Sequence, residues 1–168
     1  MVLPKRKIVR LSEFDYSTPG FYFITICTFH KKLVFGLVQD GRVLLNHCGE
    51  IATDHLVLVQ HHIENVFIDK YVVMPNHIHM ILQIVEAGKE QPKSVRLHSQ
   101  KSTQIVPKVV QMYKASVTRS LGMSGLWQRS YYEHVIRNEV DYSRIWEYID
   151  TNPIKWEMDA YYSNYLDA

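Results

Sequence analysis

Cysteine is scarce in this chain, which holds only Cys27 and Cys48 among its 168 residues. Two cysteines without a CxxC pair provide neither a disulfide framework nor a cysteine-built zinc site. Apolar runs of about 18 residues are also absent, so no membrane-spanning helix is predicted. The N-terminal stretch MVLPKRKIVR has basic residues but no apolar segment of the kind that a secretory signal requires. We therefore expect an intracellular, cytoplasmic protein.

The residues that are present are typical of a folded protein, because 46% are hydrophobic and 12% are aromatic. We predict a single domain over residues 1–168. The formal net charge is only +2, but residues 87–137 carry nine Lys and Arg residues against two Glu residues, whereas residues 138–168 carry a net charge of −5. The basic middle segment is where a polyanion would bind. A solvated basic helix and loop would have the same composition.

Four stretches of the first half are rich in β-branched and aromatic residues and predict extended structure. They are PGFYFITICTF (19–29), LVFGLVQDGRVLLN (33–46), NVFIDKYVVM (65–74) and HIHMILQIV (77–85). Turns are expected at Asp40-Gly41 and at Pro75-Asn76. Between 48 and 62 the apolar residues recur as they do on one face of a helix, which predicts a helix laid on a sheet.

The second half begins with a change in composition. Residues 86–102 gather Gly, Pro, Ser and Lys and predict a mobile basic linker within the domain. Three elements are expected after it, a helix over about 104–121, a strand over 126–137 and a helix over 138–150. The last helix must end near Asn152, because Pro153 disfavours the helical conformation in the residue before it. This order favours an α+β fold, a ferredoxin-like (RRM-like) antiparallel sheet with helices packed on one face.

Two histidines one residue apart interrupt the apolar strand predicted over 77–85. Because alternate strand residues face the same way, His77 and His79 point to one face, and Ile78 and Met80 belong to the apolar opposite face. Their Cα atoms would lie about 6–7 Å apart, a span across which two ring nitrogens can converge on one metal ion. Such a site needs a third ligand. The alternative is a pair of hydrogen-bonded histidines on a half-exposed strand face.

A second pair of polar residues lies in the last predicted helix. Tyr148 and Asn152 are four residues apart and therefore share one helical face, from which a phenol and an amide oxygen could project together into a site on the sheet. The alternative is structural. An aromatic residue next to Ile145 and Ile149 packs in the core, and an asparagine before a proline ends a helix.

Three ordered motifs, VMPNHIHMIL, LWQRSYYEHVIRN and YIDTNP, closely resemble those of the single-tyrosine HUH transposases. The resemblance is to the branch of REP-associated tyrosine transposases, which are related to the insertion-sequence-200-like enzymes. It extends from about Gly20 to Lys155. It implies the HUH endonuclease fold, in which an antiparallel sheet carries the histidine pair.

The resemblance also implies roles for particular residues. His77 and His79 match the two metal-binding histidines, Tyr148 matches the nucleophile, and Asn152 matches the third metal ligand one turn later. The implied cofactor is a divalent ion, Mg²⁺ or Mn²⁺. The WQ segment is typical of the family, and Arg129 directly after it is expected near DNA. Lys108, Lys114 and Arg119 lie on the solvent side of the predicted helix and are the other expected DNA contacts.

The implied activity is metal-dependent nicking and rejoining of single-stranded DNA, on a substrate that contains a hairpin. Tyrosine has a pKa of about 10 and is a poor nucleophile at neutral pH, so the cation would have to make the phosphorus more electrophilic. The product is a covalent 5′-phosphotyrosine and a free 3′-OH, which another strand can use for rejoining. Two other classes stay open, a domesticated, non-mobilising nucleic-acid-binding protein of RRM-like fold and a metal-dependent hydrolase. A homodimer and a monomer are both compatible with the sequence.

Overall fold

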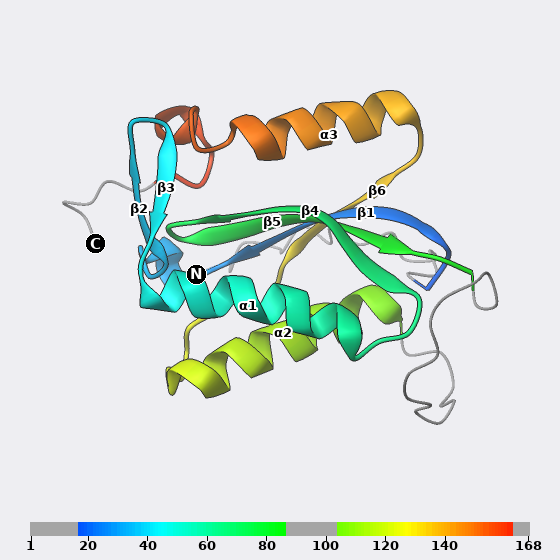
Figure 1. The fold of residues 1–168 in the computed structure, drawn as a ribbon, viewed down its shortest axis with the longest axis horizontal. Helices are drawn as coiled ribbons and strands as arrows, with labels where there is room; N and C mark the ends of the chain where they lie inside the picture. Colours follow the sequence, from blue (N-terminus) through cyan, green and yellow to red (C-terminus); the bar gives the residue numbers. More distant parts are fainter. Residues whose placement is uncertain (1–16, 87–103, 163–168) are drawn as a thin grey trace, which may run out of the picture.

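The computed structural model describes residues 17–86 and 104–162, which are arranged around one antiparallel sheet (Figure 1). Its four strands lie in the order β4-β5-β1-β6. Their bounds are Gly20–Cys27 for β1, Val66–Met74 for β4, His77–Ile84 for β5 and Tyr132–Ile136 for β6. The α+β class with an antiparallel sheet is therefore as predicted. The linker predicted over 86–102 lies, apart from Glu86, outside the described residues.

The larger core lies between the sheet and two helices, α1 (His47–His61) and α2 (Ile105–Leu121), below the sheet in Figure 1. The even-numbered residues of β1 and β5 supply the strand side of this core, and one apolar face of each helix supplies the other side. The buried members include Tyr22, Ile24, Ile78, Met80, Leu82, Leu56, Val59, Val109, Val110, Tyr113 and Val117. Asn46 begins α1, because its side chain accepts a hydrogen bond from the backbone N–H of Gly49 at 3.0 Å.

The third helix, α3 (Glu139–Thr151), crosses the opposite face of the sheet (Figure 1). It buries Ile145 and Ile149 against Phe23, Ile81 and Ile136 in a smaller second core. The expectation that all helices pack on one face is therefore wrong, and it holds for α1 and α2 alone. The reason is that the odd-numbered positions of the central strands are also partly apolar, so this face too needs a cover.

Strand β5 lies between β4 and β1, so backbone hydrogen bonds hold it on both edges. Its register with β1 places Thr25 opposite His79 and Cys27 opposite His77. The turn at Pro75-Asn76 joins β4 to β5 as predicted. The carbonyl of Asn76 accepts from the backbone N–H of Thr28 at 2.9 Å, which ties this turn to the end of β1.

Two predicted strand regions have different outcomes. The stretch 33–46 forms a separate hairpin of β2 (Gly36–Gln39) and β3 (Arg42–Leu45), as expected from its turn residues. The strand expected over 126–137 is shorter, because β6 covers only its last part. Within the residues before β6, Trp127 makes one isolated bridge to Thr28 and then donates its Nε1–H to the carbonyl of Lys114 at 3.1 Å. The backbone N–H of Gln128 also donates to the carbonyl of Cys27 at 2.9 Å, so both the end of β1 and α2 hold the chain there.

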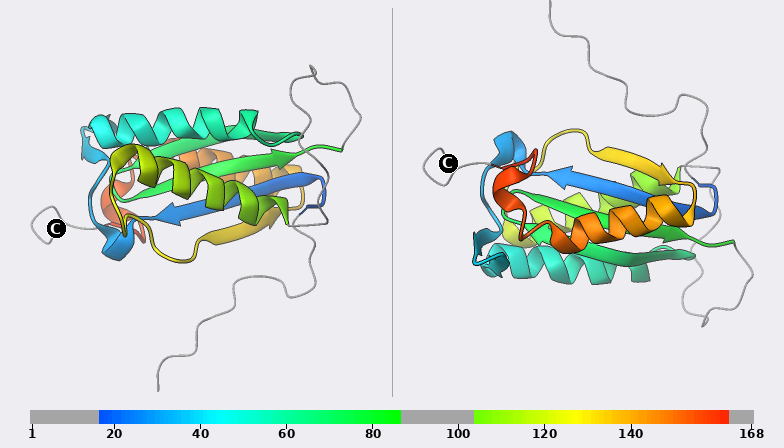
Figure 2. Two further views of the ribbon diagram at one scale, coloured as in Figure 1. Left: turned by 90° about the horizontal axis from the view of Figure 1, so that it is seen from below. Right: turned by 90° about the horizontal axis from the view of Figure 1, so that it is seen from above.

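Two short 3-10 helices complete the described part, η1 (Phe29–Lys31) after β1 and η2 (Trp156–Met158) after α3. Seen from the α3 side, the segment around η2 turns back at the end of the sheet where β1 ends (Figure 2). Among the described helices, none has the length and apolar character needed to cross a membrane.

Candidate active site

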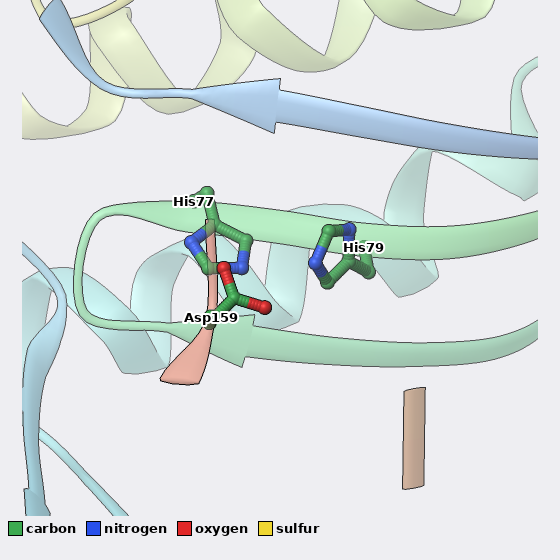
Figure 3. A group of neighbouring side chains, drawn as sticks. All are labelled: His77, His79 and Asp159. Carbon is green, nitrogen blue, oxygen red and sulfur yellow. The ribbon is translucent and has the colours of Figure 1, made fainter. Parts of the chain in front are cut away.

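The two histidines of β5 lie on the face of the sheet that α3 covers. Their rings are neighbours, with centroids 4.4 Å apart, and they project from the same side of the strand (Figure 3). The same-face arrangement agrees with the prediction. The half-exposed strand face of the alternative interpretation is not observed, because His77 is 0% and His79 is 1% exposed. Helix α3 and the segment after it cover a surface that the strand pattern alone suggests is open to water.

Each imidazole is oriented by a hydrogen bond at Nδ1. The Thr25 hydroxyl lies 2.8 Å from Nδ1 of His79, and the side-chain oxygen of Asn76 lies 2.8 Å from Nδ1 of His77. The amide nitrogen of Asn76 donates to the carbonyls of Lys31 and Tyr161, so its oxygen is the acceptor and His77 carries its proton on Nδ1. Nε2 of neutral His77 is therefore the atom with the free lone pair, as in a metal-ligating histidine.

Helix α3 brings Tyr148 and Asn152 to the histidines. The Tyr148 hydroxyl lies 3.2 Å from Nε2 of His79, and the ring centroids of these two residues are 5.1 Å apart. Asn152 is the C-terminal cap of the helix and is 1% exposed, whereas Tyr148 is 37% exposed. The shared helical face predicted for this pair therefore points at the sheet, with the phenol still open to solvent on one side.

Side chains at the edge of the sheet hold α3 in this position. The Tyr142 hydroxyl donates to the carboxylate of Asp69, and Lys70 forms an ion pair with Asp150. The Lys70 ammonium also lies over the ring of Trp146, 4.6 Å from its centroid. Since Asp69 and Lys70 belong to β4, the helix with Tyr148 is attached to the sheet of its own chain.

One residue of this cluster, Asp159, is not predicted from the sequence; it follows η2. Its Oδ2 accepts hydrogen bonds from the Tyr148 hydroxyl at 2.9 Å and from the amide nitrogen of Asn152 at 2.7 Å. One nitrogen of His77, one of His79 and one carboxylate oxygen of Asp159 lie within 4.8 Å of one another (Figure 3). No spacing rule connects an acid seven residues after Asn152 to a strand in the middle of the chain, so only the fold reveals it.

Two buried atoms of the cluster have no hydrogen-bond partner among the described residues. They are Nε2 of His77 and Oδ1 of Asn152. An unpaired buried polar atom costs about 1–3 kcal/mol, so two neighbouring ones require an explanation. Both atoms have free lone pairs, and nitrogen and amide oxygen are both donors that divalent cations accept. The residues therefore fit a cation held by His77, His79 and Asn152.

Burial also sets the protonation of these groups. Desolvation lowers the pKa of His77 to about 4, although the charge of Asp159 and the side chain of Asn152 act in the opposite direction. Desolvation, and to a smaller extent His77, lower the pKa of His79 well below its ordinary value. Both rings are therefore neutral at pH 7, which is the state that binds metal. Burial and the hydrogen bond to Asp159 raise the pKa of Tyr148 well above its ordinary value.

The residues predicted to contact DNA lie elsewhere. Lys108, Arg119 and Arg129 are exposed, the first two on α2, on the face of the sheet opposite α3 (Figure 1). Lys114 is half-buried, and its ammonium donates to the carbonyls of Gln128 at 2.8 Å and Ser130 at 3.1 Å. None of these four residues has a described contact with the histidine cluster. Lys114 instead holds the segment before β6 against α2.

A comparison with protein families identifies the chain. The model of the family described as "Transposase IS200 like" matches residues 29–152. This range includes His77, His79, Tyr148 and Asn152, and it ends before Asp159.

Individual proteins are also similar. An uncharacterized protein of Haemophilus influenzae is 36% identical over 167 residues, which cover 94% of this chain and 93% of that protein. A REP-associated tyrosine transposase of Escherichia coli is 28% identical over 118 residues, 67% of this chain and 62% of the relative. Among solved structures, a REP-associated tyrosine transposase bound to a REP hairpin has a TM-score of 0.59 at 22% identity and covers 82% of this chain and 68% of that one. This structural likeness concerns the fold.

Proposed function

This chain belongs to the IS200-like transposase family, in its branch of REP-associated tyrosine transposases, and we propose that it nicks and rejoins single-stranded DNA through a covalent phosphotyrosine at Tyr148. One observation carries the proposal. The Tyr148 hydroxyl lies 3.2 Å from Nε2 of His79, next to two buried lone-pair atoms that have no partner among the described residues, on His77 and Asn152. The proposed nucleophile and the proposed cation ligands are therefore neighbours.

Tyr148 would attack the phosphorus of the scissile phosphodiester. The bond from the phenol oxygen to phosphorus forms as the bond from phosphorus to the 3′ oxygen breaks, which leaves a 5′-phosphotyrosine and a 3′-OH. The phenol gives up its proton, and the departing oxygen takes one up. Attack by another 3′-OH reverses the step and releases Tyr148, so rejoining needs no ATP. The packing of α3 holds the phenol at the edge of the cluster, which favours attack in one orientation.

His77 and His79 would hold a divalent ion through their Nε2 atoms, and Asn152 through Oδ1. When bound, Mg²⁺ or Mn²⁺ polarises the scissile phosphate and stabilises the charge that develops on its oxygens. The Nδ1 hydrogen bonds to Asn76 and Thr25 keep both rings turned toward this point. Because the phenol of Tyr148 is protonated at neutral pH, it depends on such assistance.

We propose single-stranded DNA with a hairpin as the substrate. The similar solved structure is described as bound to a REP hairpin, and we extend that ligand class to this chain. The exposed Lys108, Arg119 and Arg129 are the proposed contacts for the phosphate backbone. Action on chromosomal DNA would place the protein in the cytoplasm, with the nucleoid.

A non-catalytic RNA-binding module is a less favourable assignment. RNA recognition modules stack bases on aromatic residues of an open sheet face. Here α1 and α2 cover one face, and α3 packs on Phe23 and Ile81 of the other face. A hydrolase would use the same ion but attack with water, so it would leave no DNA attached to the protein.

Trapping of the covalent product tests the proposal. A hairpin-containing single strand is incubated with the protein and Mn²⁺ or Mg²⁺, and adducts that survive denaturation are separated on a gel. The wild type should form the adduct, and Tyr148→Phe should form none while still binding the DNA. Tyr71→Phe is the control, because Tyr71 is an exposed tyrosine of β4 that takes no part in holding α3. An adduct of normal yield in Tyr148→Phe would overturn the assignment.

A further inference from the structure

We propose that Asp159 is a fourth protein ligand of the cation held by His77, His79 and Asn152, and that it allows the ion to bind before DNA arrives. This inference rests on the proposed function and deepens it. Asp159 lies outside residues 29–152, the range that matches the family model, so the resemblance assigns it no role.

Distance places Asp159 in the site. Its carboxylate oxygen and one nitrogen from each histidine lie within 4.8 Å of one another, and Figure 3 shows the carboxylate beside the two rings. The two oxygens of Asp159 already accept three hydrogen bonds, from Tyr148, Asn152 and the backbone N–H of Tyr161. Two carboxylate oxygens offer about four lone-pair positions, so capacity for a metal bond is left.

The negative charge of Asp159 is the reason that this carboxylate matters for cation binding. His77, His79 and Asn152 are neutral ligands, and all three are almost completely buried. A divalent cation among neutral buried groups would lose its hydration without any compensating negative charge until a phosphate arrives. Asp159 is the one acid that approaches both histidines among the residues described. Its negative charge offsets half of the ion's charge, and carboxylate oxygen is a preferred ligand of Mg²⁺ and Mn²⁺.

Asp159 also decides which atom of Asn152 is available. An ionised carboxylate can only accept hydrogen bonds, so the Asn152 amide must turn its nitrogen toward Asp159, at 2.7 Å. The amide oxygen is then directed elsewhere, and it is one of the two buried atoms without a partner. The same carboxylate therefore orients Asn152 as an oxygen ligand.

The segment that carries Asp159 is held firmly against the site. Trp156 is 3% exposed, and its ring lies 5.9 Å from that of His77. The side chain of Asn76, which orients His77, also donates to the carbonyl of Tyr161 at 2.9 Å. Contacts on both sides of Asp159 thus fix its position, and little conformational entropy is lost when it binds an ion.

Titration of Mn²⁺ into the metal-free full-length protein, without DNA, tests this inference by calorimetry. Asp159→Asn should weaken Mn²⁺ binding by roughly ten- to hundredfold, as loss of a metal ligand or its close support does. Glu157→Gln is the matched control, because Glu157 is an exposed acid in the same segment, and surface changes alter such equilibria by about twofold or less. His77→Ala should abolish specific binding.

A second measurement guards against misfolding of the variant. Thermal unfolding with chelator shows whether Asp159→Asn is folded, and added Mn²⁺ should then raise the melting temperature of the wild type and Glu157→Gln but not of Asp159→Asn. If Asp159→Asn melts early in chelator, Asp159→Glu, which keeps the carboxylate, should retain most of the Mn²⁺-induced rise.

The outcomes distinguish a failure of the proposed Asp159 ligand from a failure of the proposed function. Wild-type Mn²⁺ affinity in Asp159→Asn, together with loss in His77→Ala, would overturn the role of Asp159 and leave the proposed function standing. Tighter binding in Asp159→Asn would overturn it as well. Undiminished binding in both His77→Ala and His79→Ala would instead remove the metal site itself, and with it the proposed function.

Discussion

The hydroxyl of Tyr148 lies 3.2 Å from Nε2 of His79, although the two residues are 69 positions apart in the chain. This contact joins the helix with the proposed nucleophile to the strand with the proposed metal ligands. The contact lies within one chain, since α3 is attached to β4 by the Tyr142–Asp69 and Lys70–Asp150 pairs. In this structure Tyr148 and the two histidines of one chain therefore lie together in one cluster.

The covalent adduct should map to Tyr148. Tyr161 is its closest structural competitor, because its ring lies 4.7 Å from that of His77. Tyr132 also lies near the cluster, because it pairs with Thr25 and its ring lies 6.2 Å from that of Phe23, whereas the Tyr142 hydroxyl is bonded to Asp69. Proteolysis of the trapped complex and mass spectrometry should find the nucleotide on the peptide with Tyr148, because α3 places its hydroxyl beside His79 with one side open to solvent. A nucleotide on the Tyr161 peptide would reassign the nucleophile.

His77→Ala should abolish cleavage and also reduce stability. A prediction from the strand pattern alone is that the fold stays intact, because His77 lies on the less apolar face. The structure changes this expectation, since His77 is fully buried and its ring packs against His79, Trp156 and Tyr161. We expect a loss of about 1–3 kcal/mol in the free energy of unfolding. Urea denaturation checks the stability, and a cleavage assay at a temperature where the variant is folded checks the chemistry.

The position of α3 should depend on Ile149. This side chain is fully buried in the smaller core under the helix, so Ile149→Ala should cost about 2–5 kcal/mol of unfolding free energy. Val140→Ala is the matched control on the same helix, since Val140 is 80% exposed, and it should change stability by at most about 0.5 kcal/mol. Equal effects of the two changes in urea denaturation would contradict the packing of α3 described above.

Stability of the metal-free protein should fall as the pH drops below about 6.5, the ordinary pKa of histidine. The pKa of His77 is lowered to about 4 in the folded state. Between these two values the unfolded chain binds a proton that the folded protein excludes, so acid favours unfolding. The dependence should be measured by denaturation at several pH values with chelator present. His77→Gln should weaken it, leaving the part that His79 contributes. A stability that rises toward pH 4 would be inconsistent with buried neutral histidines.

Binding of single-stranded DNA should fall steeply with salt. If about 4 phosphates are neutralised, a plot of log affinity against log salt should have a slope of about −3. Lys108→Glu, Arg119→Glu and Arg129→Glu should each weaken binding, whereas Arg42→Glu on β3, outside the basic segment, should have a smaller effect. Fluorescence anisotropy at several salt concentrations provides the measurement. A slope near zero would mean that the basic segment only keeps the protein in solution.

Lys114 should behave differently from the other basic residues. Its ammonium donates to the carbonyls of Gln128 and Ser130, and burial lowers its pKa to about 8. Lys114→Met should therefore lower the free energy of unfolding by about 1–3 kcal/mol, because two carbonyls lose their donor. Lys108→Met, at an exposed position of the same helix, should not. Urea denaturation of the two variants distinguishes Lys114, which stabilises the fold, from Lys108, which is proposed only to contact DNA.

Local patterns of the sequence determined much of this protein. The period of two residues in a strand places His77 and His79 on one face, and the period of a helix places Tyr148 and Asn152 one turn apart. Asn46 marks the start of α1 through the side-chain hydrogen bond that its residue type favours. Helix α3 ends at Thr151, close to Pro153 as predicted, although Asn152 itself keeps helical backbone angles. These features depend on neighbours in the chain, so the sequence alone is sufficient to predict them.

Tertiary structure decided the rest, because it depends on contacts between residues far apart in the chain. A periodic pattern identifies an apolar face but not its partner, so the sequence could not show that α3 packs on the face opposite α1 and α2. That packing turns two strand histidines from half-exposed residues into buried ones with lowered pKa values. The same long-range packing returns the chain after η2 to β5 and brings Asp159 to the histidines, where no spacing in the sequence could place it.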